Sequence, residues 1–105
     1  VISTGWDRYF DSKAYYENYP SLSQDACRFI ADCGITSIAC DMPGLSSADI
    51  DKIHEYLLGR KIPLIEGLCG LGKLKKEKFL FIAMPLKIKD CDGSPCRAAA
   101  FYFED

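Results

Sequence analysis

Along this chain, segments whose apolar residues recur with the period of a strand alternate with segments that have the period of a helix. This alternation constrains the fold more than any other feature of the sequence. Apolar residues recur at helical spacing over residues 22–33 and 47–59. Strand-like segments stand before, between and after these stretches, at residues 1–6, 35–41 and 61–67. Strands that alternate with helices are typical of α/β proteins. We therefore predict an α/β fold.

The last third of the chain predicts a closing hairpin. Residues 78–88 and 97–103 both look like strands, and they are joined around the turn residues Asp92–Pro95. Residues 7–20 are aromatic-rich and irregular, with a short helix expected around residues 13–18. At 105 residues, we expect one domain, 1–105, with about five strands and two main helices.

Capping residues mark the ends of both helices. For the first, Ser21 and Gln24 can form a capping box, and Gly34 is suited to the position after the last turn. For the second, Ser46 or Ser47 can cap the start, and Gly59 is the expected end. The apolar side of the first helix is predicted from Leu22, Ala26, Phe29, Ile30 and Cys33, and that of the second from Ile50, Ile53, Leu57 and Leu58.

Charge and hydropathy exclude two classes of partner. The net charge is −2, and the only basic cluster, KLKKEK at residues 73–78, is short and interrupted, so we predict no nucleic-acid binding. No apolar run approaches the roughly 18–20 residues of a membrane helix, so we predict no membrane span. The six cysteines form no C-x-x-C pair, and three lie in apolar segments. We expect reduced thiols in a cytoplasmic protein, with a Cys91–Cys96 bridge as the alternative.

His54, the only histidine, and Glu66 are the leading candidates for a functional site. His54 lies on the apolar side of its predicted helix, and period two places Glu66 on the same strand face as Ile62 and Leu64. Each has a simpler interpretation, as a hydrogen-bonded core histidine and a solvated carboxylate. A buried carboxylate needs a partner, however, and imidazole and carboxylate are ordinary ligands of zinc and manganese.

Asp41 is a third candidate, at the edge of the same site. It ends a predicted strand, and the carboxyl ends of strands are where sites form in open α/β sheets. The alternative is a turn residue whose carboxylate accepts backbone N–H groups. Asp7 and Arg8 we interpret as a structural pair. The chain has no G-x-S-x-G elbow and no P-loop, and no cysteine lies in a recognisable nucleophile motif.

Six stretches in order along the chain resemble one family. They are TGWDRY (4–9), YYENYPSLSQDACRFIADCGI (15–35), ACDMPGL (39–45), HEYLLGRKIPLIEGL (54–68), KFLFIAMPLKI (78–88) and DGSPCRAAA (92–100). Together they resemble the C-terminal half of the cyclase family of metal-dependent hydrolases. This family includes kynurenine formamidase (arylformamidase) and isatin hydrolase. Because the similarity is spread over six segments, it is more specific than any one motif.

The resemblance implies a swivelling β/β/α-type fold, here a partial domain, and a metal-activated water that hydrolyses a small-molecule amide. It also implies that His54 and Glu66 help to bind zinc or manganese in a complete site, whereas this chain alone need not hold an ion. The family's N-terminal signature, H-x-G-T-H-x-D-x-P-x-H, supplies the other ligands and a catalytic histidine, and it is absent from this sequence. Gly67 and Gly70 stand where the family commonly has asparagine, which departs from its pattern around the glutamate.

We therefore expect the C-terminal portion of a metal-dependent amide hydrolase that supplies two metal ligands and is not catalytically competent alone. The catalytic residue itself is not identifiable in this chain. The chain begins with Val1 inside a predicted strand, which we interpret as part of a longer polypeptide. The alternatives are a non-catalytic binding or regulatory module, and a subunit completed by another chain. In each case we expect a homo-oligomer or a partner that provides the N-terminal half.

Overall fold

The computed structural model of the protein describes residues 1–103. The chain divides into two compact units, Val1–Gly72 and one that begins at Lys73, and each is described by itself. The single domain expected over 1–105 stays a prediction. The elements of the two units are α1 (Gln24–Asp32), β1 (Ile38–Ala39), α2 (Ile50–Gly59), β2 (Leu64–Ile65), β3 (Leu80–Pro85), β4 (Cys96–Phe101) and short 3-10 helices at Trp6–Tyr9, Lys13–Tyr16 and Leu71–Lys73. The α/β prediction is confirmed.

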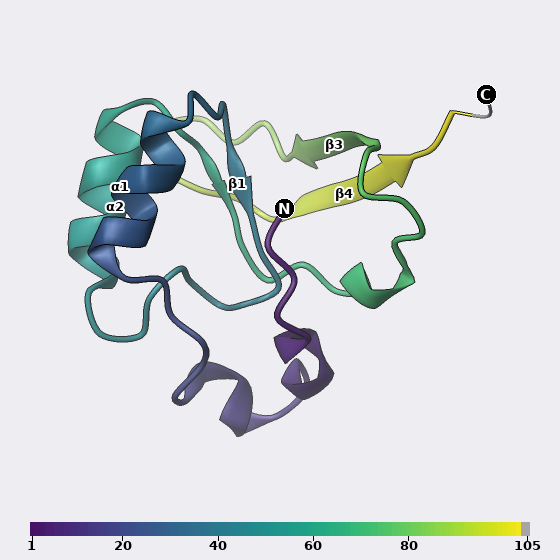
Figure 1. The fold of residues 1–105 in the computed structure, drawn as a ribbon, viewed down its shortest axis with the longest axis horizontal. Coiled ribbons are helices and arrows are strands. Elements are labelled where there is room, and N and C mark those ends of the chain that lie inside the picture. Colours follow the sequence, from purple (N-terminus) through teal and green to yellow (C-terminus); the bar gives the residue numbers. More distant parts are fainter. Residues whose placement is uncertain (104–105) are drawn as a thin grey trace. The chain divides into compact units, whose positions relative to one another are not determined.

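A small parallel sheet lies at the centre of the first unit. β1 pairs with β2 in parallel, and Ile2 forms a parallel bridge to Cys40 on the other side of β1. α1 and α2 lie side by side on one face of β1, as Figure 1 shows. β1, α2 and β2 therefore form a strand–helix–strand unit, whose strands run in the same direction because the helix returns the chain.

The strand predicted over residues 1–6 is reduced to the single bridge at Ile2. Gly5 has a φ of +73°, in the left-handed region, and so turns the chain away from the sheet. The next residues, Trp6–Tyr9, form a 3-10 turn. Figure 1 shows this purple segment lying beyond one end of β1. The other strands are also shorter than predicted, because irregular loops begin soon after each parallel pairing.

α1 begins two residues later than predicted, and its cap is Ser23. The Ser23 hydroxyl accepts a hydrogen bond from the Ala26 N–H at 3.1 Å. The predicted cap from Ser21 is wrong, because the Ser21 hydroxyl accepts from the Ser47 N–H at 2.9 Å instead. Gly34 follows the last turn with a φ of +73°, as predicted.

α2 begins three residues later than predicted, because residues 46–49 form a capping turn. The Ser46 hydroxyl accepts from the N–H groups of Ala48 and Asp49 at 3.3 and 3.1 Å. At the other end the Lys61 N–H donates to the Leu58 carbonyl, and the Ile62 N–H donates to the Leu57 carbonyl. This pair of bonds is a Schellman motif, in which Lys61 holds the left-handed position.

The core of the first unit lies between the two helices and the sheet. Its buried members are Cys27, Ala31, Ile38, Cys40, Met42, Leu45, Ile53, Leu57 and Ile62. The predicted apolar sides were partly wrong, since Phe29, Cys33 and Leu58 are exposed. Cys27 and Ala31 form the buried stripe of α1, and Phe29, two residues from each, lies on the opposite side of the helix.

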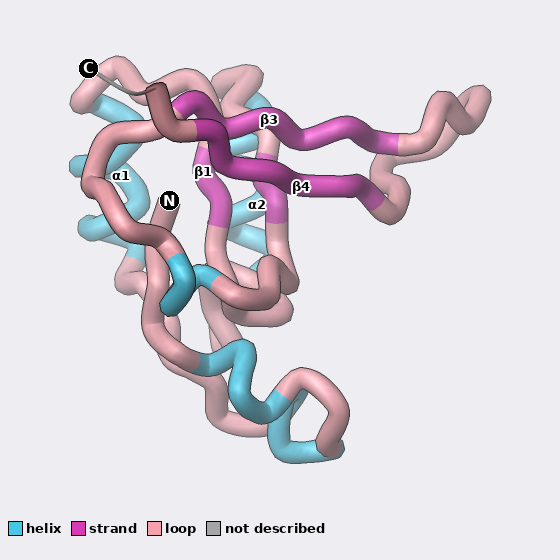
Figure 2. The backbone as a smooth tube through the Cα atoms, turned by 90° about the vertical axis from the view of Figure 1, so that its right-hand side faces the viewer, coloured by secondary structure: helices cyan, strands magenta, loops and turns pink. Residues whose placement is uncertain are grey.

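The second unit is an antiparallel ribbon of β3 and β4, paired from Leu80↔Phe101 to Pro85↔Cys96 (Figure 2). Both strands are shorter than the 78–88 and 97–103 predicted, but the hairpin is confirmed. All six cysteines are free thiols, as predicted. No helix within residues 1–103 is long and apolar enough to cross a membrane.

Candidate functional site

The structure brings His54 and Glu66 together. Nε2 of His54 lies 3.1 Å from Oε1 of Glu66. His54 is in the second turn of α2, and Glu66 immediately follows β2. Their side chains are 33% and 26% exposed, so the pair is reachable from solvent without being fully solvated. The expected meeting of the two side chains is confirmed, while their role as metal ligands stays a prediction.

A separation of 3.1 Å fits two chemical states of the pair. In one, a proton lies between the nitrogen and the oxygen, and the pair is a hydrogen bond. In the other, the two atoms lie slightly farther apart and bind one divalent ion, because ligands about 2.0–2.2 Å from a tetrahedral zinc lie roughly 3.3–3.6 Å from each other. A side-chain shift of about 0.2–0.5 Å would therefore fit the two donors to a metal, with α2 and β2 left in place.

The pair is incomplete as a metal centre within the described chain. No group of three or more His, Cys, Asp and Glu side chains in residues 1–103 is placed to hold an ion. Catalytic zinc sites use three protein ligands and a water. His54 and Glu66 can thus supply two ligands, and any further ligand has to come from elsewhere.

Asp41 lies close to the carboxyl end of β1, and its carboxylate holds the N-terminal segment. The residue is 0% exposed. Its oxygens accept from the N–H groups of Thr4, Gly5 and Trp6 at 2.7–3.2 Å and from the Thr4 hydroxyl at 2.8 Å. A carboxylate with this many donors is stable when buried without a metal. Its proposed place at the edge of a catalytic site stays a prediction.

Two tyrosines that the sequence did not single out line this region. The Tyr15 hydroxyl donates to the Asp41 carbonyl at 3.0 Å, and burial, followed by the charge of Cys69, raises the Tyr15 pKa to about 12. The Tyr19 hydroxyl donates to the Ser46 carbonyl at 2.7 Å. Burial raises the pKa of Tyr19, and the nearby Glu66 carboxylate raises it further. The aromatic-rich composition of residues 7–20 was the available signal for both.

The loop after Glu66 is shaped by two glycines. Gly67 and Gly70 have φ values of +68° and +81°. Asparagine, which the resembled family commonly has at both positions, also tolerates this conformation. The Gly67 N–H donates to the Met42 carbonyl at 2.9 Å, and the Gly70 N–H donates to Oδ2 of Asp7 at 2.7 Å. Asp7 therefore has a specific contact, whereas Arg8 lies over the ring of Tyr9.

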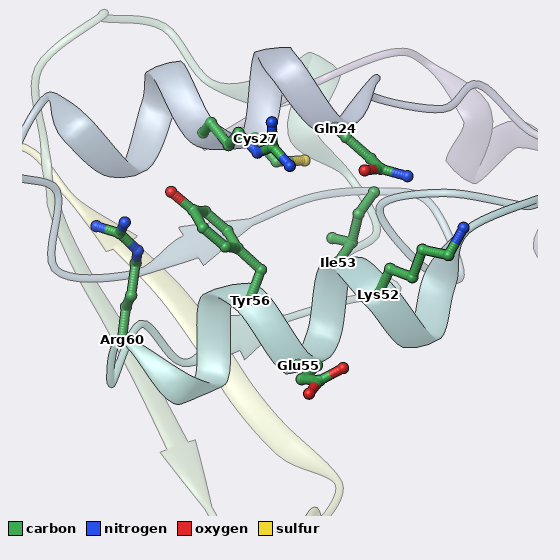
Figure 3. A pocket seen from close by; sticks show the side chains of 8 residues that line it. Gln24, Cys27, Lys52, Ile53, Glu55, Tyr56 and Arg60 are labelled. Carbon is green, nitrogen blue, oxygen red and sulfur yellow. The ribbon is translucent and has the colours of Figure 1, made fainter.

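A separate groove of about 520 Å³ runs between α1 and α2 (Figure 3). Figure 3 shows Cys27 and Gln24 of α1 facing Ile53 and Tyr56 of α2, while Glu55 points away. Three cations line the groove, but each also forms an exposed ion pair, namely Arg28 with Asp25, Lys52 with Asp49 and Arg60 with Asp32. The groove therefore has no excess of positive charge with which to bind an anion.

Comparison with known proteins places this geometry in context. The family model described as "Putative cyclase" matches residues 1–47. Kynurenine formamidase of Bacillus cereus is 30% identical over 89 residues, which cover 83% of this chain and 42% of the relative. A solved structure described as a potential metal-dependent hydrolase with cyclase activity superposes with a TM-score of 0.74 at 27% identity. The resemblance to the cyclase family is confirmed.

Similarity to two further proteins extends across almost the whole chain. An uncharacterized protein of Methanocaldococcus jannaschii is 33% identical over 103 residues, which cover 95% of this chain. The solved structure matches 90% of this chain, so the predicted partial cyclase-family fold is confirmed as well. The chain spans about half the length of these proteins, at 52% of the archaeal relative and 49% of the solved chain.

Proposed function

We propose that this chain supplies His54 and Glu66 as two ligands of a divalent metal, zinc or manganese, in a hydrolase that acts on a small-molecule amide. The observation that carries the proposal is the 3.1 Å approach of an imidazole nitrogen and a carboxylate oxygen from two different elements. Support for the reaction class comes from the similar kynurenine formamidases and from the solved structure of the same fold that is described as a potential metal-dependent hydrolase.

The residues of this chain would bind and orient the ion. α2 presents the His54 ring from the helix side, and the end of β2 presents the Glu66 carboxylate from the sheet side. A divalent ion at such a site lowers the pKa of a bound water and polarises the substrate carbonyl. Burial and the nearby Glu66 charge raise the pKa of Tyr19, so its phenol stays neutral and adds no second negative charge to the site.

We also propose that these two ligands are not sufficient for catalysis. Two ligands leave the ion too weakly held and too hydrated for the usual catalytic geometry. Further ligands and a proton-transferring group would come from another polypeptide segment, another subunit or a second copy of this chain. A cytoplasmic setting suits such an enzyme, because its six free thiols persist in reducing conditions.

Metal titration with matched variants tests the ligand roles. Zinc and manganese binding to the purified chain is measured by calorimetry for the wild type, His54→Ala and Glu66→Gln. Glu55→Gln is the control, because it removes the same charge from an exposed side chain of the neighbouring helix. We expect both site variants to lose at least tenfold in affinity and the control to retain it. Equal affinity in Glu66→Gln and Glu55→Gln would refute the assignment.

Hydrolysis assays test whether the metal site is incomplete in this chain alone. The pure chain should not turn over an aryl formamide, and activity should depend on added protein that supplies the remaining ligands. His54→Ala should abolish that reconstituted activity. Metal-dependent turnover by the pure chain would show instead that one chain, or an assembly of its copies, completes the site.

A further inference from the structure

We infer that Asp7 is a positioning residue, which holds the loop of residues 66–70 so that Glu66 stays within reach of His54. The inference rests on the proposed function for its effect on metal affinity. The contact between Asp7 and the loop, however, is a property of the protein without metal. Asp7 lies 63 positions before Gly70 in the sequence, so only the fold brings the two together.

The contact is short and specific. Oδ2 of Asp7 accepts from the Gly70 N–H at 2.7 Å, at the short end of the range for N–H···O bonds, as is typical of an ionised acceptor. It fixes a segment that has little intrinsic stiffness, because Gly67 and Gly70 both have positive φ. Glycine loses more conformational freedom on ordering than any other residue, so such a loop needs anchors to keep one conformation.

The start of the loop is already anchored to the segment that follows β1, and Asp7 anchors its end. The N–H groups of Gly67 and Leu68 donate to the carbonyls of Met42 and Cys40, both at 2.9 Å. The Leu68 side chain is almost fully buried. Without Asp7, only these two bonds would hold the loop, so motion of the freed Gly70 end would act directly on them and on Glu66, which immediately precedes them.

Asp7 is itself held in place by the buried carboxylate of Asp41. That carboxylate accepts the N–H groups of Gly5 and Trp6, the two residues before Asp7. The Asp7 carbonyl also accepts the Phe10 N–H at 3.1 Å, which closes the short turn around it. Hydrogen bonds therefore connect the Asp41 carboxylate, just beyond β1, to the two residues before Asp7, and connect Asp7 to Gly70.

A second carboxylate in the same segment provides a matched control. Burial raises the pKa of Cys69, and the charges of Asp7 and Asp11 raise it further, so both carboxylates lie near the loop. Asp11 is exposed. Replacing Asp11 changes the local charge as much as replacing Asp7 but leaves the Gly70 hydrogen bond intact.

The test compares Asp7→Ala, Asp7→Asn and Asp11→Ala in the full chain, first without metal. The readouts are the hydrogen-exchange rate of the Gly70 amide, the carboxyl carbon signal of Glu66 and the ring signals of His54, the only histidine. We expect Asp7→Ala to exchange Gly70 at least tenfold faster and to shift both site signals. Asp7→Asn keeps an acceptor oxygen, so its Gly70 exchange rate and its Glu66 and His54 signals should lie between those of Asp7→Ala and those of the wild type. Asp11→Ala should match the wild type in all three readouts.

Zinc titration of the same variants then separates this inference from the proposed function. If the wild type binds zinc through His54 and Glu66, Asp7→Ala should weaken that binding by about tenfold or more. If the wild type binds no zinc, either alone or with added protein that supplies the remaining ligands, the proposed function fails, and the metal-free readouts alone decide the role of Asp7. Unchanged Gly70 exchange and unchanged site signals in Asp7→Ala would overturn the inference, as would equal effects of Asp11→Ala. If Asp7→Ala does not fold, the same readouts in Asp7→Asn decide the inference. Gly70 exchange and site signals equal to those of the wild type would again overturn it.

Discussion

Lys61, after the end of α2, adopts a conformation that suits glycine better than any side chain. Its φ is +61°, in the left-handed region, where a Cβ atom costs roughly 1–2 kcal/mol. The position is imposed by the Schellman motif that buries Ile62 against the helix. We expect Lys61→Gly to raise the free energy of unfolding by about 1 kcal/mol, since glycine removes this strain. Urea denaturation at neutral pH measures the change.

Lys61→Ala serves as the control for this prediction. It also removes the lysine charge but keeps the Cβ atom, so it should stay within about 0.5 kcal/mol of the wild type. A Lys61→Gly variant less stable than Lys61→Ala would show that the lysine side chain contributes more than its backbone conformation costs.

The buried phenol of Tyr15 should make stability sensitive to high pH. Its pKa is raised to about 12, so the folded protein keeps the proton while the unfolded chain loses it near the ordinary value of 10.0. The stabilisation by Tyr15 is therefore fully present below pH 10 and is lost as the pH rises through 12. Near pH 8, Tyr15→Phe should cost about 1 kcal/mol, because the Asp41 carbonyl loses its donor.

The pH profile distinguishes this effect from simple packing. The stability difference between the wild type and Tyr15→Phe should narrow between pH 9 and pH 12, as measured by denaturation at fixed temperature. Tyr16→Phe is the control, because Tyr16 is 69% exposed and should give no such trend. A difference that stays constant over this range would mean that the Tyr15 phenol titrates alike in the folded and unfolded states.

At the scale of elements, the Asp41 carboxylate joins the N-terminal segment to the end of β1. Within residues 1–103, all hydrogen-bond partners of this carboxylate are donors, namely three backbone N–H groups and the Thr4 hydroxyl. In Asp41→Asn an amide group replaces one acceptor oxygen, so donor faces donor in a buried site. We expect a loss of about 2–3 kcal/mol, as for hydrogen bonds to charged groups. Amide exchange at Gly5 and Trp6 should become faster.

Asp11→Asn is the matched control for the Asp41 prediction, since it makes the same chemical change at an exposed carboxylate. It should leave both stability and the exchange of Gly5 and Trp6 unchanged. Wild-type stability in Asp41→Asn would mean that water replaces the lost acceptor and that the segment is held by other contacts.

At the scale of the whole molecule, the β3–β4 ribbon should promote association. A two-stranded ribbon is marginally stable by itself and leaves N–H and C=O groups unpaired along both edges. Large apolar side chains on and beside this ribbon are exposed, namely Leu80, Met84, Leu86, Ile88, Phe101 and Phe103. We expect self-association, or binding to a partner that covers the ribbon, and sedimentation velocity over a concentration series measures it.

A Met84→Lys variant tests whether the ribbon is the surface involved. Met84 is 52% exposed in a strand, so a lysine there can be solvated by the monomer but opposes burial in an interface. The variant should shift the association to higher concentration, whereas Phe29→Lys on the exposed side of α1 should not. A wild-type monomer at all concentrations would contradict the prediction.

Local sequence signals predicted both helices and where they end, but not where they begin. Periodicity placed both helices, and Gly34 marked the end of the first, because these features depend on residues within one or two turns. The predicted first residues of the two helices were wrong because several serines compete as caps. The fold selects among these serines. Ser21 could cap α1 by sequence, but its hydroxyl binds the Ser47 N–H. That choice depends on how residues 26 positions apart meet.

His54 and Glu66 could be predicted from the sequence because each lies on the apolar side of its own element, and the family resemblance pointed to the same pair. Composition and periodicity likewise determined the α/β class. Tertiary structure alone decided the role of Asp41, the contact between Asp7 and Gly70, and the burial of Tyr15 and Tyr19. These contacts join residues 26 to 63 positions apart, and sequence periodicity, which reflects only neighbouring turns of one element, has no information about such distances.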